Sequence, residues 1–121
     1  MKKIAIVEDT PSIAEMLSYA LQNLGYEVLP FANGKDFIAS IGSLKFDLLI
    51  LDLMLPGISG EDILREMDNR GLTAGLRLLI YSAINNPESV MDHFPQVRFR
   101  ALRKPSRLDE LLLAVKTLLA D

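Results

Sequence analysis

Short apolar runs alternate with longer amphipathic stretches along the whole chain. Five of the runs have the length and composition of β-strands: 4–7, 26–31, 48–51, 76–81 and 97–102. After each of them, apolar residues recur every three or four positions, which predicts a helix. The predicted order is βαβαβαβαβα. Strands that alternate with helices favour one parallel sheet with right-handed crossovers and helices on both faces.

Residues that favour helix ends flank most of the predicted helices. The predicted N-caps are Thr10, Asn33, Ser59 and Ser106. Gly25 is a typical stop at the end of the first helix. The fourth helix has the weakest pattern: it is predicted to begin near Asn86 and to reach about His93, because Pro95 interrupts it. We therefore expect this connection to be the least regular part of the fold.

The run Leu48–Leu51 has the pattern of a central strand that is buried on both faces, and Asp52 follows it directly. For five strands the leading topology is flavodoxin-like: a (βα)5 three-layer sandwich with a parallel sheet in the order 2-1-3-4-5. This order makes the first and third strands neighbours. Glu8 and Asp9, which end the first strand, are then expected to lie beside Asp52 at the carboxyl edge of the sheet.

The 121 residues fit one domain that covers 1–121, with the apolar and charged fractions of an ordinary globular protein. No apolar run approaches the roughly 18 residues of a membrane span, and the N-terminus does not resemble a signal peptide, so the interpretation is a cytoplasmic protein. The absence of cysteine and the single histidine exclude disulfides, thiol catalysis and multi-histidine metal sites. A net charge of −3 gives no reason to expect this domain to bind nucleic acid.

Three converging carboxylates repel one another unless a cation lies among them. Mg²⁺ suits such a site, because it prefers oxygen ligands and commonly completes its shell with water and phosphate oxygens. Ser82 and Lys104 end two further strands at the same edge. A hydroxyl and an ammonium beside a metal-bound acid are suited to hold a phosphoryl group, and Asp52 could itself be the nucleophile that forms an aspartyl-phosphate.

These residues resemble the motifs of a known family. Glu8-Asp9, the segment Asp52-Leu-Met-Leu-Pro-Gly-Ile-Ser-Gly, Ser82-Ala83 and Lys104-Pro105 are similar to the motifs of the receiver domain of two-component response regulators. Each motif alone is weakly specific, but four of them at strand ends in the right order are strongly specific. The resemblance covers the whole chain.

The resemblance implies a role for each acid. Asp52 would accept phosphate from a histidine kinase or a phosphotransfer protein. Asp9 and Asp52 would bind Mg²⁺, or Mn²⁺ in its place, with the backbone carbonyl of Met54 as a further ligand. Glu8 would assist through a water molecule.

The resemblance also implies how the phosphoryl group is held and used. Lys104 would pair with its oxygens and Ser82 would hydrogen-bond them in the active state, while Ala83 would leave access to the site. The peptide bond between Lys104 and Pro105 is often cis in this family. The domain would catalyse only its own phosphorylation and dephosphorylation, and would signal to a downstream effector domain or protein. A homodimer through the face built from the fourth helix, fifth strand and fifth helix is a further expectation.

One position departs from the family pattern. Receivers usually carry Phe or Tyr three residues before the lysine, and that ring moves when the Ser or Thr is drawn toward the phosphate. Here the position is Ala101, so the usual ring switch is absent and the face formed by the fourth helix and fifth strand is expected to be remodelled. Phe99 and Tyr81 are the two candidates to replace it.

Other interpretations stay open at this point. Because of Ala101, the chain could be a degenerate receiver that acts as a phosphorylation-independent interaction module. A flavodoxin-like cofactor binder is disfavoured because Glu8 and Asp9 would repel FMN, and an Asp-x-Asp phosphatase because Met54 stands where the second acid belongs. The basic cluster from Arg98 to Arg107 is interpreted as protection of an edge strand, with a docking surface for an acidic partner helix or a second receiver as the alternative.

Overall fold

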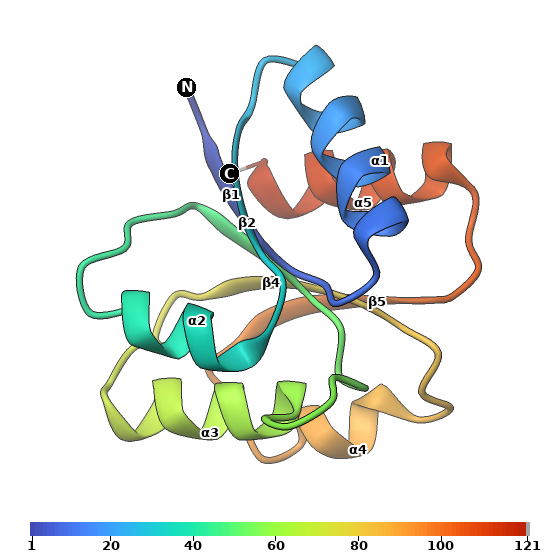
Figure 1. Cartoon of the computed structure of the whole chain (residues 1–121). Helices are drawn as coiled ribbons and strands as arrows, with labels where there is room; N and C mark the ends of the chain where they lie inside the picture. Colours follow the sequence, from blue (N-terminus) through green and yellow to red (C-terminus); the bar gives the residue numbers. More distant parts are fainter. Residues whose placement is uncertain (121) are drawn as a thin grey trace.

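The computed structural model describes residues 1–120, which form one parallel sheet between two layers of helices (Figure 1). The strands are β1 (Lys3–Val7), β2 (Glu27–Phe31), β3 (Leu48–Leu51), β4 (Arg77–Ser82) and β5 (Arg98–Arg103). The helices are α1 (Pro11–Asn23), α2 (Gly34–Ser40), α3 (Gly60–Asn69), α4 (Pro87–Met91) and α5 (Leu108–Leu119). The sheet order β2-β1-β3-β4-β5 confirms the predicted flavodoxin-like topology.

The sheet separates two apolar cores. Helices α1 and α5 cover one face, and α2, α3 and α4 cover the other (Figure 1). All four residues of β3 are buried, as the unbroken run Leu48–Leu51 predicts for a central strand. Alternate residues of that strand belong to the two cores, because successive side chains of a strand point to opposite faces. Within residues 1–120, no helix has both the length and the apolar character needed to cross a membrane.

The predicted helix caps are confirmed in part. The side chain of Asn33 accepts a hydrogen bond from the Asp36 N–H, and Ser59 forms a capping box with Asp62. Thr10 is at the N-cap position of α1, but its side chain makes no capping hydrogen bond.

The prediction that Ser106 caps the last helix is wrong. Arg107 is the N-cap of α5, and the buried hydroxyl of Ser106 has no hydrogen-bond partner among the described residues. The apolar side of α5 becomes fully buried only at Leu111, whereas Leu108 is 39% exposed. Core packing therefore does not require α5 to begin one residue earlier.

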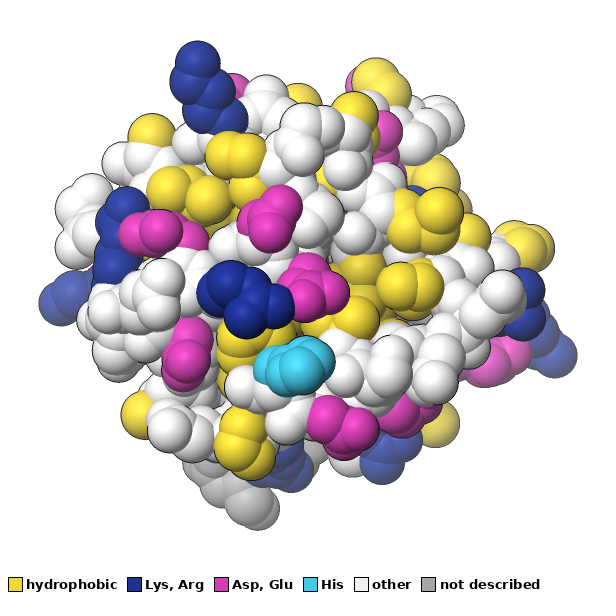
Figure 2. Space-filling view, turned by 90° about the horizontal axis from the view of Figure 1, so that it is seen from below, with side chains coloured by type: hydrophobic (Ala, Val, Ile, Leu, Met, Phe, Trp, Pro, Cys, Tyr) yellow, Lys and Arg dark blue, Asp and Glu magenta, His cyan; other side chains and the backbone are white. Residues whose placement is uncertain are grey.

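Helix α4 is shorter than predicted. It ends at Met91, and the segment that follows consists of tight turns instead of continuing to His93. Phe94 and Val97 are buried in the core on the α3 side, and the turns carry both side chains inward. His93 itself is exposed, and Figure 2 shows the only histidine side chain at the surface of the face that carries α3 and α4.

The turn after β3 is held against the start of α3 by Gly60. The Gly60 N–H donates to the carbonyl of Leu53 at 3.2 Å. A Cβ atom at residue 60 would lie 2.6 Å from the Leu53 Cα and 2.7 Å from the Asp52 carbonyl oxygen. Such distances exclude any side chain, so glycine is required for this close approach of α3 to the loop that carries Asp52.

We expect Gly60→Ala to lower the free energy of unfolding by about 1–3 kcal/mol, because the methyl group must displace backbone atoms. Urea denaturation measures the change. Gly42→Ala is the matched control, since a Cβ atom there meets no atom within 4 Å, and its stability should stay within about 0.5 kcal/mol of wild type. Equal stability of the two variants would contradict the proposed tight contact.

Candidate functional site

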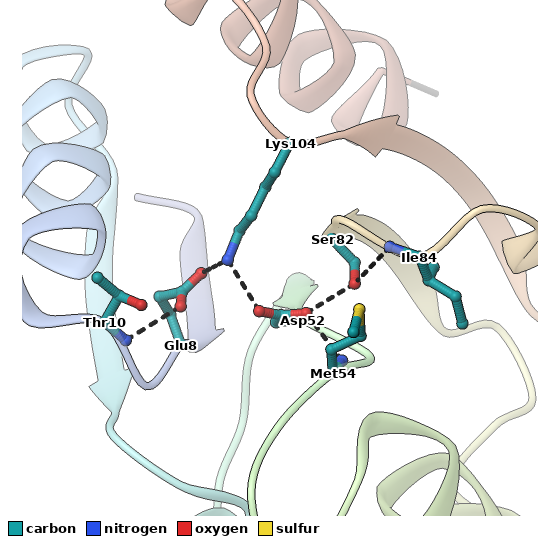
Figure 3. Close-up of polar contacts among 7 residues, drawn as sticks. All are labelled: Glu8, Thr10, Asp52, Met54, Ser82, Ile84 and Lys104. Carbon is teal, nitrogen blue, oxygen red and sulfur yellow. Dashed lines mark hydrogen bonds and ion pairs between the residues drawn. The ribbon is translucent and has the colours of Figure 1, made fainter.

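The carboxyl ends of four strands bring the predicted site residues together (Figure 3). Glu8 and Asp9 follow β1, Asp52 follows β3, Ser82 is the last residue of β4 and Lys104 follows β5. The predicted convergence of these five residues is confirmed by the contacts among them. The parallel topology explains it, because all strands of the sheet end at the same edge.

Lys104 connects two acids that are far apart in the sequence. Its Nζ donates to Glu8 Oε1 at 2.6 Å and to Asp52 Oδ2 at 2.8 Å. Glu8 is 3% exposed and Asp52 is 5% exposed, so neither carboxylate is well solvated. The ammonium supplies the positive charge that such a pair needs. Glu8 Oε2 also accepts a hydrogen bond from the backbone N–H of Thr10.

The second oxygen of Asp52 is held from the other side. Oδ1 accepts a hydrogen bond from the hydroxyl of Ser82 at 2.7 Å and from the backbone N–H of Met54 at 2.9 Å. Both carboxylate oxygens are therefore fixed, and Figure 3 shows the group between Lys104 and Ser82. Fixed donors around one carboxylate preorganise it for reaction with an incoming group.

These contacts control the ionisation of the site. Burial raises the pKa of Asp52, but the hydrogen bonds from Lys104, Met54 and Ser82 outweigh it, so the pKa lies below the ordinary value of 3.8. Burial lowers the pKa of Lys104, but the hydrogen bonds and charges of Asp52 and Glu8 raise it above the ordinary 10.5. Asp52 is therefore a carboxylate and Lys104 an ammonium at neutral pH.

The acids also fit a divalent cation. Glu8, Asp9 and Asp52 each place one carboxylate oxygen within 4.8 Å of the others. Asp9 is exposed and, among the described residues, makes no hydrogen bond or ion pair, so its oxygens are available to a ligand. An all-oxygen donor set that is open to water on one side suits Mg²⁺ or Mn²⁺ better than zinc or copper.

Sequence reasoning missed two contacts of the site. The ring of Tyr81 lies 5.4 Å from the Nζ of Lys104, and the backbone N–H of Met54 donates to Asp52. The side chain of Met54 is 59% exposed. The only sequence signal for the Tyr81 contact is that this residue directly precedes Ser82.

Ala101 lies beside a cavity. A cavity of about 160 Å³ lies between the ends of β4 and β5 and the start of α4, and its lining includes Ser82, Pro87 and Ala101. Phe99 packs with Ala101 against the same core, whereas Tyr81 belongs to the core on the opposite face of the sheet. Tyr81 therefore does not fill the space beside Ala101.

Comparison with known proteins identifies the family. The model of the response regulator receiver domain matches residues 4–116. The chain belongs to the response regulator receiver domain family. The phosphate regulon transcriptional regulatory protein PhoB of Pseudomonas aeruginosa is 32% identical over 118 residues, which are 98% of this chain and 52% of PhoB. The DNA-binding dual master transcriptional regulator RpaA of Synechocystis is 30% identical over 98% of this chain and 49% of its own length.

Solved structures of receiver domains share the fold. The response regulator TrrA of Thermotoga maritima, solved in complex with Mg²⁺-BeF, is 31% identical with a TM-score of 0.81 and covers 98% of this chain and 99% of its own. The chain thus spans 99% of the solved TrrA chain but about half the length of the curated relatives it matches. The receiver fold and family are shared with these proteins.

We expect Lys104→Met to lower the free energy of unfolding at pH 7 by about 1–3 kcal/mol, because it leaves two buried carboxylates without their cation. The lowered pKa of Asp52 stabilises the wild-type fold above about pH 4, and this contribution is lost as the pH falls through the lowered value. The difference between wild type and variant should therefore shrink below pH 4.

Urea denaturation between pH 3 and pH 7 measures both effects. Lys116→Met is the control. Lys116 is exposed on α5, so this substitution removes the same charge at a position away from the site. If the difference in free energy of unfolding between wild type and Lys104→Met stays constant over this pH range, the destabilisation of the variant does not arise from the Asp52 charge.

Proposed function

We propose that residues 1–121 act as the phospho-accepting receiver domain of a two-component system and that Asp52 is the acceptor. The observation that supports this most directly is the placement of the Asp52 carboxylate between the Lys104 ammonium and the Ser82 hydroxyl. This arrangement leaves a nucleophile ionised, oriented and beside two groups that can contact phosphoryl oxygens. A degenerate receiver gains no support, because the acceptor and the groups around it are all in place.

The proposed reaction transfers a phosphoryl group from a phosphohistidine to Asp52. A carboxylate oxygen of Asp52 bonds to the phosphorus of a phosphohistidine, and the bond from phosphorus to the imidazole nitrogen breaks. The electron pair of that bond stays on the imidazole, which leaves as the free side chain after protonation. The product on this chain is an acyl phosphate. Water later attacks the phosphorus, the bond from phosphorus to the Asp52 oxygen breaks, and inorganic phosphate leaves while the Asp52 carboxylate is regenerated.

Lys104 and Ser82 each exchange one partner during this step. In the free domain Lys104 donates to Asp52 Oδ2 and Ser82 donates to Oδ1. Once a phosphoryl group is attached, its oxygens carry more negative charge than the carboxyl oxygens of the acyl phosphate. Both donors then move to phosphoryl oxygens, and this local shift is the signal that the rest of the domain transmits.

Asp9 and Asp52, with the carbonyl of Met54, would hold Mg²⁺, and Glu8 would assist through water. When bound, Mg²⁺ neutralises charge on the acids and on the phosphoryl oxygens. The close spacing of the three carboxylates and the Mg²⁺-BeF complex of TrrA support this assignment. In the free domain Lys104 donates to both Glu8 and Asp52.

The partners follow from the same chemistry. A histidine kinase or a phosphotransfer protein would supply the phosphoryl group, and an effector domain or protein would read the result. The curated relatives are named as DNA-binding or transcriptional regulators, which suggests a transcriptional output. The edge position of β5 and its arginines are compatible with a homodimer through α4, β5 and α5.

We expect Asp52→Asn to abolish phosphorylation by acetyl phosphate or phosphoramidate in the presence of Mg²⁺, because the amide is not a competent nucleophile. Mass spectrometry of the intact protein detects the added phosphoryl group. Asp92→Asn, which changes an exposed acid beyond α4, should be phosphorylated like wild type. A wild-type protein that accepts no phosphoryl group from either donor would favour the degenerate receiver instead.

We expect Asp9→Asn to weaken Mg²⁺ binding at least about tenfold, because it removes a carboxylate ligand from the cluster. Without Mg²⁺ the same variant should be as stable as wild type or more stable, since a like charge is removed from beside Asp52. Isothermal titration calorimetry and urea denaturation measure the two effects, with Asp92→Asn again as control. Unchanged Mg²⁺ affinity would remove Asp9 from the metal site.

A further inference from the structure

Lys104 has to cross a neighbouring strand to reach its partners. It follows β5, the edge strand, whereas Asp52 follows β3 and Glu8 follows β1. Strand β4 lies between β5 and β3, and strands of a sheet are spaced by about 4.8 Å. The lysine side chain therefore has to extend past the position of β4 in the sheet. Figure 3 shows it extended, with its ammonium between Glu8 and Asp52.

Tyr81 is the residue of β4 that lies along this path. It pairs in register with Leu102 of β5, and both side chains belong to the core under α1 and α5. Lys104 is two residues beyond Leu102, so its side chain points to the same face of the sheet. The Nζ of Lys104 lies 5.4 Å from the centroid of the Tyr81 ring, within the range of a cation–π contact.

The ring complements the two hydrogen bonds of the ammonium. A lysine ammonium has three N–H donors, of which one is directed to Glu8 and one to Asp52. The ring offers negative potential without a directed acceptor atom. Tyr81 is 5% exposed and packed in the core, so the ring is fixed and the contact is largely shielded from water.

We propose that Tyr81 is a positioning residue for Lys104, and that its ring keeps the ammonium at the acceptor site while the lysine exchanges a carboxylate oxygen for a phosphoryl oxygen. The proposal rests on the proposed function of Asp52. A contact without a fixed hydrogen-bond direction suits this exchange, because it persists while the ammonium moves from one oxygen to another. Without the ring, the long lysine side chain is less restricted before the reaction. Fixing it in the transition state then costs conformational entropy, which slows the transfer.

The test compares initial rates of phosphorylation by phosphoramidate with Mg²⁺ in wild type, Tyr81→Phe and Tyr81→Leu. Tyr81→Phe keeps the ring and should react within about twofold of wild type. Tyr81→Leu should react about threefold to thirtyfold more slowly, the range that a shielded cation–π contact corresponds to. Tyr81→Met repeats the comparison with a more flexible side chain of similar volume, in case the leucine variant does not fold.

A double-mutant cycle separates positioning from general loss of packing. If Tyr81 acts through Lys104, Tyr81→Leu should cause no further loss of rate when Lys104→Met is already present. Phe94→Leu is the matched control: Phe94 is also buried and lies 5.9 Å from a cation, Arg65, but it packs in the core on the opposite face of the sheet. The Phe94→Leu variant should lose about as much stability as Tyr81→Leu, while its phosphorylation rate stays at the wild-type value.

An NMR measurement reports the contact itself. The Hε protons of Lys104 should show an upfield ring-current shift in wild type and Tyr81→Phe, and lose it in Tyr81→Leu. The proposal is overturned if Tyr81→Leu reacts at the wild-type rate, or if it slows the reaction equally with and without Lys104. Failure of the proposed function is distinguishable from either result, because wild type itself would then take up no phosphoryl group.

Discussion

Two carboxylates that are almost fully buried, those of Glu8 and Asp52, share the single ammonium of Lys104. Two like charges about 4 Å apart repel by about 4 kcal/mol at the effective dielectric typical of protein surfaces, and the Lys104 ammonium between the acids offsets this repulsion. The contact joins the ends of β1, β3 and β5, which are distant in sequence. The chemistry of the site and the closure of this sheet edge therefore depend on the same group.

The fold provides what this contact requires. The order β2-β1-β3-β4-β5 places the two acid-bearing strands side by side, and the edge strand is close enough for a lysine side chain to reach them. The loop that carries Asp52 is held by the close packing of Gly60 against Asp52 and Leu53, and by the hydrogen bond from the Met54 N–H to Asp52. The Asp52 carboxylate thus owes its orientation to backbone geometry as much as to its side-chain partners.

Much of this arrangement could be predicted from the sequence, because it depends on local signals. Apolar runs followed by single polar residues give the strand ends, and parallel topology then brings Asp52, Ser82 and Lys104 to one edge. The start of α5 after Ser106 and the early end of α4 could not be predicted, because tertiary packing decides them: the chain shortens α4 to bury Phe94. The Tyr81 contact depends on strand register, which no local pattern encodes.

The two donors to Asp52 connect it to different halves of the molecule. Ser82 lines the cavity beside Ala101 and α4, whereas Lys104 lies over Tyr81 on the side of α1 and α5. Because the side chain of Ala101 is small, it places no aromatic ring beside the Ser82 hydroxyl in this cavity. In this chain the aromatic ring nearest the Lys104 ammonium is that of Tyr81, on the opposite face of the sheet from Ala101. Lys104 therefore connects Asp52 to packed side chains on the α1 and α5 face, whereas Ser82 connects it to the cavity on the α4 face.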